Sequence, residues 1–302
     1  MIAFGIAITD EDMYKEFALA GIDRIKEPDT DILAFVSVGS IFRNYNLLLE
    51  QAKKRGGYEA LILIHQDAEI IDPDFLSKVR EALAGPDVGI VGCAGAVDVR
   101  NIAWWEGSVR WASYTHRFDE LGGGEIPALS WVPEHIPIYA ELGEVDSIDG
   151  FVMAFSPWAI ENLRFDEAIG GGLHGYDFDI SMQTRAAGKK VVVADLKVIH
   201  HHSLKVISDE EGWINAHMLL TEKWHDHLPV TTTDWRLRAR RAEAELSASI
   251  VAQTSAGLIR DLSVKKLEEE IDGYRNSLSW RITKPLRWIA SILRRGEPKS
   301  RG

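Results

Sequence analysis

LILIHQDAEIID, residues 61–72, is the stretch from which the fold class can be predicted. It opens with four consecutive apolar residues and stops on His65, Gln66 and Asp67. A short continuous apolar run is typical of a strand that is buried on both faces, as in a parallel sheet. Ligands of open α/β sheets bind outside the carboxyl ends of such strands, so we expect Asp67 at a ligand site.

The segments around this stretch alternate between strand and helix patterns. Apolar runs predict strands at 2–8, 32–38 and 88–93, and helical spacing predicts helices at 44–56 and 73–84. The second helix is expected to use Asp72 as its N-cap, with Pro73 at its first position and Gly85 after its end. The alternation predicts a βαβαβ half of a doubly wound, mostly parallel α/β sheet.

Residues 95–145 interrupt this order, because they are rich in Trp, Gly and Pro and show little periodicity. We expect them to form loops and short strands over the carboxyl edge of the sheet. The order then resumes with a strand at 146–156, a short helix capped by Ser156, a helix at about 176–187 and a strand at 190–195. The catalytic domain is expected to span residues 1–230.

Composition restricts the class of protein further. The 302 residues suffice for one full-sized domain and an appendage. A single cysteine, Cys93, excludes an intramolecular disulfide and fits a reducing compartment, as an inert buried thiol. No leader and no spanning apolar run is visible, so we expect a cytoplasmic protein, peripheral at the inner face of the cell membrane.

Charge is distributed unevenly along the chain. The net charge is −12, yet residues 236–302 hold 15 Lys or Arg against 8 Asp or Glu. The rest of the chain, residues 1–235, is strongly acidic, which argues against nucleic-acid binding by the main domain. Residues 231–275 are rich in Ala and Glu with helical spacing, which predicts a helical arm or coiled-coil linker and possible self-association through 236–275.

The tail at 276–302 combines an apolar stripe with a basic face. The stripe comprises Leu278, Ile282, Leu286, Ile289 and Leu293, and the opposite face comprises Lys284, Arg287, Arg294 and Arg295. Trp280 and Trp288 lie at the margins. This pattern predicts a helix that associates with an anionic membrane surface. Packing onto the catalytic domain or a partner protein explains the same stripe.

Several motifs in order carry a resemblance to a known family. They are HQD at 65–67, DPDFL at 72–76, DGF at 149–151, FDE at 165–167, GYDFDISMQTRAAGKKV at 175–191 and HHHS at 200–203. The chain resembles family-2 glycosyltransferases of the GT-A fold, in the bacterial branch with HQD in place of Asp-x-Asp. The likeness covers roughly residues 30–205.

The resemblance implies an inverting, metal-dependent enzyme of hexosyl or deoxyhexosyl type. It would move a sugar from a nucleotide-diphosphate donor to a saccharide or lipid-linked glycan, in bacterial surface polysaccharide synthesis. The implied cofactor is Mn²⁺ or Mg²⁺, which bridges the donor phosphates and offsets charge on the leaving group.

The resemblance makes Asp67 the metal ligand. His65 stands where the family has an acidic residue that holds ribose or metal, and imidazole suits Mn²⁺ better than Mg²⁺. Alternation along a strand puts His200 and His202 on one face and His201 on the other. Either His200 or His202 is expected to join Asp67. A solvated histidine run and a loop-capping Asp67 are the structural alternatives.

Asp177 occupies the position of the family's catalytic carboxylate, the base that takes the proton of the acceptor hydroxyl. Asp179 is the second candidate, and capping of the helix N-terminus explains both residues without catalysis. We expect Asp149 to line the donor or acceptor pocket. His174 is expected to contact donor phosphate or acceptor.

The nucleotide side follows from the resemblance alone. Its expected contacts lie over the first two strands and the following helix, at Thr9, Ser37, Ser40, Asn44 and Asn46. N-capping explains Asn44 equally well. Trp104 and Trp105 are either platforms for sugar faces or core residues.

Two rival functions come from other classes. A metal-dependent phosphoester hydrolase would use His65, Asp67, His200 and His202. A catalytically silent nucleotide-sugar-binding module would explain the loss of the first acidic residue of the tripeptide.

Overall fold

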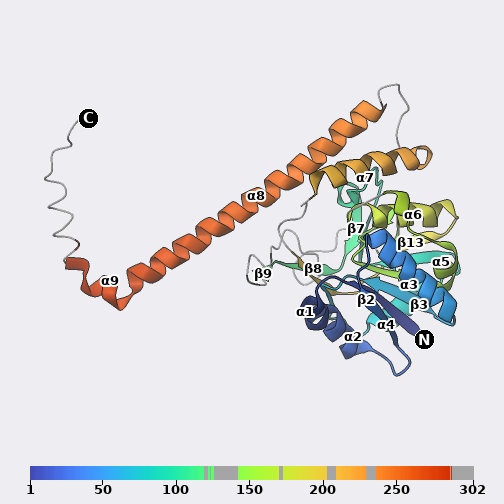
Figure 1. The fold of residues 1–302 in the computed structure, drawn as a ribbon, viewed down its shortest axis with the longest axis horizontal. Helices are drawn as coiled ribbons and strands as arrows, with labels where there is room; N and C mark the ends of the chain where they lie inside the picture. The colour runs from blue at the N-terminus through green and yellow to red at the C-terminus, as the bar shows by residue number, and fades with distance from the viewer. Residues whose placement is uncertain are drawn as a thin grey trace. The chain divides into compact units, whose positions relative to one another are not determined.

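The computed structural model describes residues 1–118, 122, 124–125, 142–169, 173–202, 209–228, 236–285 and 287. A seven-stranded sheet in the order β10-β13-β5-β12-β3-β1-β2 forms its centre (Figure 1). The strands are β1 (Ile2–Ile8), β2 (Asp31–Val36), β3 (Ala60–Ile64), β5 (Val88–Gly92), β10 (Gly143–Val145), β12 (Val152–Phe155) and β13 (Lys190–Val193). All but β10 and β12 run in one direction. The predicted α/β class with a mostly parallel sheet is confirmed.

Helices cover both faces of this sheet. Along β3, Ile62 and Ile64 belong to one apolar cluster and Leu61 and Leu63 to the other, because alternate side chains point to opposite faces. The first cluster includes residues of α2 (Ala20–Ile25) and α4 (Phe75–Leu83), and the second includes residues of α3 (Ile41–Arg55) and α5 (Pro157–Asn162). Helix α6 (Tyr176–Ala186) contributes to both clusters.

Two predicted helices begin elsewhere than expected. Helix α3 starts three residues earlier, because the Ser40 hydroxyl caps it, so the N-cap role for Asn44 is wrong. Helix α4 starts at Phe75, because the Asp72 carboxylate accepts from Asp74 N and pairs with Lys78. The ends of α3 and α6 agree with the glycine signals.

The predicted strand at 146–156 is divided. Within this range β12 belongs to the large sheet, whereas β11 (Ser147–Ile148) pairs with β6 (Ala94–Val97). The chain turns at Asp149, whose carboxylate accepts from Phe151 N. β12 then enters antiparallel between β3 and β5.

Two small sheets contain the described strands of the 95–145 excursion other than β10. One has the order β11-β6-β7, with β7 at Ser108–Ala112. The other has the order β4-β14-β8-β9, formed by β4 (Ala68–Ile70), β14 (Val198–His202), β8 (Tyr114–Phe118) and β9 (Gly124–Glu125). The short helices of this domain are α1 (Glu11–Met13), η1 (Tyr14–Leu19), η2 (Trp104–Glu106) and η5 (Glu167–Ile169). Residues 126–141 lie outside the described part.

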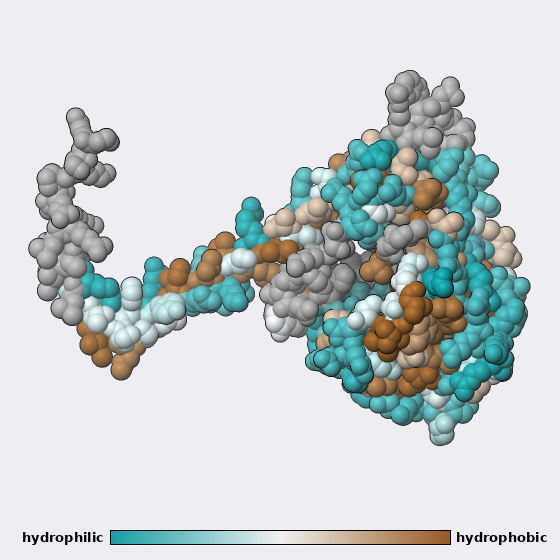
Figure 2. Space-filling model, viewed as in Figure 1, coloured by the Kyte–Doolittle hydropathy of each residue, from teal (hydrophilic) through white to brown (hydrophobic). Residues whose placement is uncertain are grey.

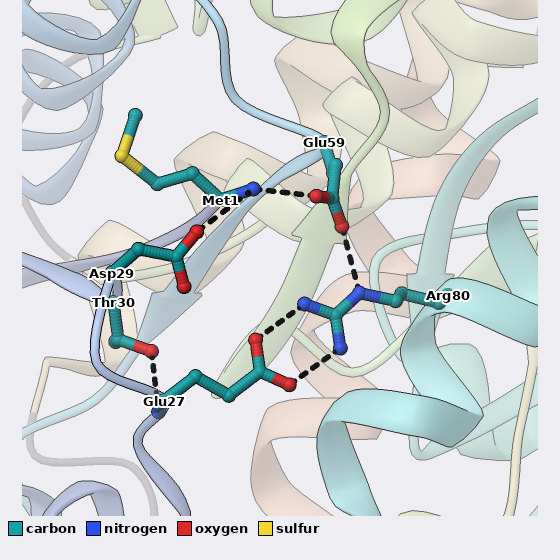
Figure 3. Close-up of polar contacts among 6 residues, drawn as sticks. All are labelled: Met1, Glu27, Asp29, Thr30, Glu59 and Arg80. Carbon is teal, nitrogen blue, oxygen red and sulfur yellow. Dashed lines mark hydrogen bonds and ion pairs between the residues drawn. The ribbon is translucent and has the colours of Figure 1, made fainter.

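A charged network ties together the edge of the sheet where β1 and β3 begin (Figure 3). The Arg80 guanidinium at the end of α4 contacts both Glu27 and Glu59. Glu59 also accepts from the amino terminus of Met1. The network lies at the amino ends of these parallel strands, so it supports the scaffold and leaves the carboxyl edge for chemistry.

After β14 the described residues form the helices α7 (Glu210–Lys223), η6 (His225–His227), α8 (Arg236–Asn276) and α9 (Leu278–Ile282). Two compact units are present, Met1–Gln253 and Thr254–Gly302, and their boundary falls within α8. The expected C-terminal helical extension is therefore present. In the described ranges, no helix is both long and apolar enough to span a membrane.

Candidate active site

Three side chains at the ends of β3 and β14 face one another. Asp67 Oδ1 lies 3.5 Å from His200 Nε2 and 3.8 Å from His65 Nδ1. One ligand atom from each residue lies within 4.8 Å of the others, which is close enough to share one metal ion. The donor set of two imidazole nitrogens and one carboxylate oxygen fits Mn²⁺ better than Mg²⁺.

Strand pairing brings His200 to Asp67 across the sequence. β14 pairs antiparallel with β4, and His200 stands opposite Ala68. The His201 amide donates to the Asp67 carbonyl at 2.8 Å, which locks this register. The His201 ring points to the other face, where it stacks on Phe17 and contacts Glu69 at 2.9 Å. The His202 side chain lies outside the described part.

The surroundings of His65 favour a neutral ring. Burial lowers the pKa of His65 to about 4, and the Asp67 carboxylate opposes that shift only partly. Its Nε2 lies 2.8 Å from the Tyr176 hydroxyl. A metal on Nδ1 would require the proton on Nε2, which would then donate to Tyr176. Such an outer partner orients a ligand histidine.

The surroundings of His200 shift its pKa in the direction opposite to that of His65. Burial lowers the pKa of His200, but the Asp67 carboxylate and the charge of Asp149 together outweigh it, and the net shift is upward. The ring stacks on Phe151 with 4.4 Å between centroids. The Phe151 carbonyl in turn accepts from His65 N at 2.9 Å. Phe151 thus holds both histidines in place.

Two carboxyl groups with raised pKa values lie beside this cluster. Burial, followed by the charge of Asp149, raises the pKa of Asp177 to about 7. Burial also raises the pKa of Asp149, whose carboxylate accepts from Trp104 Nε1 at 3.2 Å. A carboxyl whose pKa is near neutrality suits proton transfer at neutral pH.

Two glycines fix Asp177 in its position. A Cβ on Gly150 would lie 2.4 Å from the Tyr176 ring, so this ring can lie against the turn before β12 only because Gly150 has no side chain. Gly175 has φ +78°, and a Cβ there would lie 2.4 Å from Leu220 of α7. The start of α6 is thereby clamped between β12 and α7.

Asp179 serves a different purpose. It is fully buried, and its carboxylate accepts from Trp224 Nε1 at 2.7 Å and from Gln183 Nε2 at 2.8 Å. Lys223 Nζ lies 2.9 Å away. These contacts tie α6 to the end of α7, so Asp179 faces away from Asp177 and is not placed as a base.

Sequence reasoning missed three polar residues of this region. The Gln66 amide accepts from Thr9 N at 2.7 Å and Asp10 N at 2.9 Å, and donates to the Thr9 hydroxyl. Tyr176 orients His65, and the Tyr45 hydroxyl is buried with no hydrogen-bond partner in the described ranges. Gln66 sits between two ligand candidates, which is the one signal that could have found it.

Most residues predicted for the nucleotide side brace their own loop. Asn44 accepts from Val38 N at 3.0 Å and donates to Ser37 Oγ at 2.7 Å, while Ser40 caps α3. The Asn46 side chain donates to the Phe165 carbonyl at 2.9 Å and accepts from the Phe165 amide at 2.8 Å. These two bonds hold α3 to the segment after α5.

Aromatic residues form a cluster near Asp149. Trp104 is 3 % exposed, so its place is in the core and not on a sugar platform. Trp105 is 40 % exposed and its ring centroid lies 5.7 Å from that of Trp213. The ring centroid of His174 lies 5.3 Å from that of Trp213, so the structure places His174 beside this cluster.

A family model described as a glycosyltransferase-like family matches residues 3–222. The chain belongs to this family. The enzyme is thus a glycosyltransferase, and its sheet with helices on both faces is the predicted GT-A type. The match spans β1 to α7 and includes each candidate residue named above.

Two curated relatives are similar to this glycosyltransferase. The streptomycin biosynthesis protein StrF of Streptomyces griseus is 26% identical over 227 residues, which is 74% of each chain. The O-antigen biosynthesis protein RfbC of Myxococcus xanthus is 25% identical over 219 residues, 67% of this chain and 16% of its own length.

Solved structures with similar backbones include the mannosyltransferase PcManGT from Pyrobaculum calidifontis in complex with GDP-Man and Mn²⁺. It is 13% identical with a TM-score of 0.46, and the match covers 99% of this chain and 87% of that one. TarS of S. aureus matches with a TM-score of 0.46 and 10% identity, over 76% of this chain and 40% of its own.

Proposed function

We propose that this glycosyltransferase is inverting and metal-dependent, and that it transfers a sugar from a nucleotide-diphosphate donor to a saccharide or lipid-linked glycan. We also assign it to the branch in which HQD replaces Asp-x-Asp. The observation that carries the proposal is the cluster of His65, Asp67 and His200, with Asp177 nearby.

The cluster would hold Mn²⁺ through one carboxylate oxygen and two imidazole nitrogens. When bound, the cation offsets the charge that develops on the departing diphosphate. Asp67 brings the negative charge that attracts the cation, and Tyr176 and Phe151 keep the two imidazole rings in position. His65 is neutral near pH 7, as a metal ligand must be.

Asp177 is the proposed base. Its carboxylate would accept the proton of the acceptor hydroxyl as that oxygen attacks the anomeric carbon from the face opposite the leaving diphosphate. Attack from that face gives inversion in a single displacement. A base with a pKa of about 7 takes up this proton readily and is still largely ionised at slightly alkaline pH.

The acceptor class is proposed from the relatives. Their names place them in the biosynthesis of streptomycin and of O-antigen. We therefore propose a role in biosynthesis with a saccharide or glycan acceptor, with bacterial surface polysaccharide as the favoured product. We propose that Trp105 and His174, whose rings both pack near Trp213, contact this acceptor.

A donor screen tests this function. Thermal shift is measured with a panel of UDP-, GDP- and TDP-sugars, each with Mn²⁺, Mg²⁺ or EDTA. We expect one nucleotide class to stabilise the protein, and only when a cation is present. The Asp67→Ala variant should lose this cation-dependent shift. A shift that is equal with EDTA and with Mn²⁺ would overturn the metal assignment.

The rival functions predict other products. A phosphoester hydrolase would release phosphate from simple phosphoesters, and a silent module would bind donors without turnover. The proposed transferase instead releases nucleoside diphosphate together with a glycosylated product. Membership of a glycosyltransferase family supports the third outcome.

The tail supports a second part of the proposal, association with an anionic membrane surface. In α9, Leu278 and Ile282 are exposed, and Arg287 lies 3.7 Å over the ring of Trp280. Exposed apolar residues beside basic ones suit an interfacial helix. The other predicted stripe and basic residues, Leu286, Trp288, Ile289, Leu293, Arg294 and Arg295, lie outside the described part.

Flotation with vesicles of phosphatidylcholine and phosphatidylserine tests the tail. The full chain should float, and a chain that lacks residues 276–302 should stay in the dense fraction. High salt should weaken the flotation of the full chain, because the basic residues are screened. Equal flotation of both chains would contradict a membrane role for the tail.

A further inference from the structure

The second half of α8 exposes four large apolar side chains. Val264 is 48 % exposed, Leu267 57 %, Ile271 47 % and Tyr274 70 %. Figure 2 shows apolar side chains along this extended helix in the view drawn. Single exposed apolar residues are ordinary, but a series along one helix indicates an interaction surface.

The spacing of these residues is that of a two-stranded coiled coil. Their separations are three, four and three residues, so Val264 and Ile271 take a positions and Leu267 and Tyr274 take d positions of one heptad frame. We call these four residues the α8 seam. β-branched residues at a together with Leu at d favour parallel dimers.

From the α8 seam we infer that its partner is a second copy of this chain, paired in parallel and in register. Glu270 then takes a g position and Arg275 the e position of the following heptad. In a parallel pair these two positions face each other across the interface, so two Glu270 to Arg275 ion pairs form by symmetry.

Other arrangements do not use these charges in the same way. An antiparallel pair sets g against g and e against e, and so does not bring Glu270 opposite Arg275. Within its own chain the Arg275 guanidinium lies 3.6 Å from Asp272, with both side chains exposed. An exposed pair of this kind is weak and leaves the guanidinium able to reach a partner.

The seam is short, which sets how tightly the copies pair. The preceding d position is Arg260, and α8 ends at Asn276, where Ser277 caps the next helix. Two heptads bury little surface, and short helices are marginal by themselves. We therefore expect dimers that form and dissociate with protein concentration.

Charge exchange tests the pairing directly. Light scattering at rising concentration should show the mass of the full chain rise from 33.8 kDa toward twice that value. Glu270→Arg and Arg275→Glu should each stay monomeric, because like charges face each other. An equimolar mixture of the two variants should recover the dimer, because opposite charges face again.

The matched control is Lys266→Glu, which lies outside the a, d, e and g positions and should dimerise like wild type. A wild-type chain that is monomeric at every concentration would overturn the proposal. So would a wild-type dimer with no recovery in the mixture, because it would show another pairing. Far-UV circular dichroism confirms that each variant keeps its helix.

Disulfide trapping gives an independent test. Cys93 is buried, so an added cysteine is the one exposed thiol in the described ranges. Ile271→Cys at an a position should form a covalent dimer under mild oxidation. Glu269→Cys, on the outer face, should form at least about five-fold less, and equal yields would contradict the seam. Neither result depends on the proposed transfer reaction.

Discussion

On one side of the site, His65 and Asp67 follow β3, His200 lies in β14, and one ligand atom of each lies within 4.8 Å of the others. On the other side, Asn44 and Asn46 use their hydrogen bonds on backbone and side-chain groups of the protein itself. The sequence resemblance assigned ligand contacts to both sides. The comparison teaches that ligand-type side chains from the end of β3 and from β14 gather into the candidate metal cluster, whereas Asn44 and Asn46 use their hydrogen bonds to hold the protein segments around them.

Replacing the proposed base should reduce the rate of transfer more than any other variant. Asp177→Asn keeps the side chain's size but removes the carboxylate, so transfer should fall by about 10²- to 10⁴-fold. Donor binding, measured by thermal shift, should remain, because Asp177 is not a proposed metal ligand. Wild-type turnover in this variant would remove Asp177 from the role of base.

A single methyl group added to the turn before β12 tests whether the position of the Tyr176 ring beside His65 matters for turnover. In Gly150→Ala the new Cβ would lie 2.4 Å from the Tyr176 ring and push it away from His65. Displacement of about 1 Å can cost on the order of 10²-fold in rate. The matched control is Gly273→Ala in α8, where no atom would lie within 4 Å and turnover should not change. Equal rates in both variants would argue against a role for the Tyr176 contact.

The pH profile sharpens the assignment of the base. Because the folded pKa of Asp177 is about 7, kcat/KM should fall about tenfold per pH unit below that value as the carboxylate is protonated, and level off above it. A bound cation would lower this pKa and move the inflection to more acidic pH. In Asp177→Asn, the residual rate should not fall with decreasing pH in this way. An unchanged acidic fall in that variant would assign the titration to another group.

Replacing Asn46, which holds α3 to the segment after α5, should lower the free energy of unfolding and leave the rate of transfer unchanged. Asn46→Ala leaves the Phe165 amide and carbonyl without partners, which costs about 1–3 kcal/mol of unfolding free energy. Turnover per folded molecule should stay near wild type. Asn162→Ala, which removes one exposed bond, is the control and should change stability far less. A large loss of donor affinity with normal stability would return Asn46 to the nucleotide pocket.

The sequence predicted much of the scaffold because its signals are local. The buried strand at 61–64, the glycine after α3 and the helix that begins near Asp177 are all recognised within about ten residues. The strand end indicated Asp67 as a ligand-site residue, and the family resemblance assigned metal binding to Asp67 and the role of base to Asp177. His200 could be paired with Asp67 only as one of two choices, because β14 meets β4 after an interval of more than a hundred residues.

Other features depended on tertiary contacts that no local pattern contains. The antiparallel entry of β12 follows from the turn at Asp149, and the buried bonds of Asp179 follow from the packing of α7. Gln66 and Tyr176 are common residue types, and their functions arise from the neighbours that the fold gives them. The division of the chain after Gln253 likewise falls within one uninterrupted helix, where composition gives no signal.

Direct titration of Mn²⁺ tests the central claim, that His65, Asp67 and His200 form a metal site. The electron paramagnetic resonance signal of free Mn²⁺ is followed with the nucleoside diphosphate that the donor screen identifies. Wild type and His201→Ala should each bind one Mn²⁺ per chain, because His201 points to the other face, whereas His200→Ala should bind at least tenfold more weakly, on the order of 1.4 kcal/mol. Equal binding by all three proteins would contradict the account.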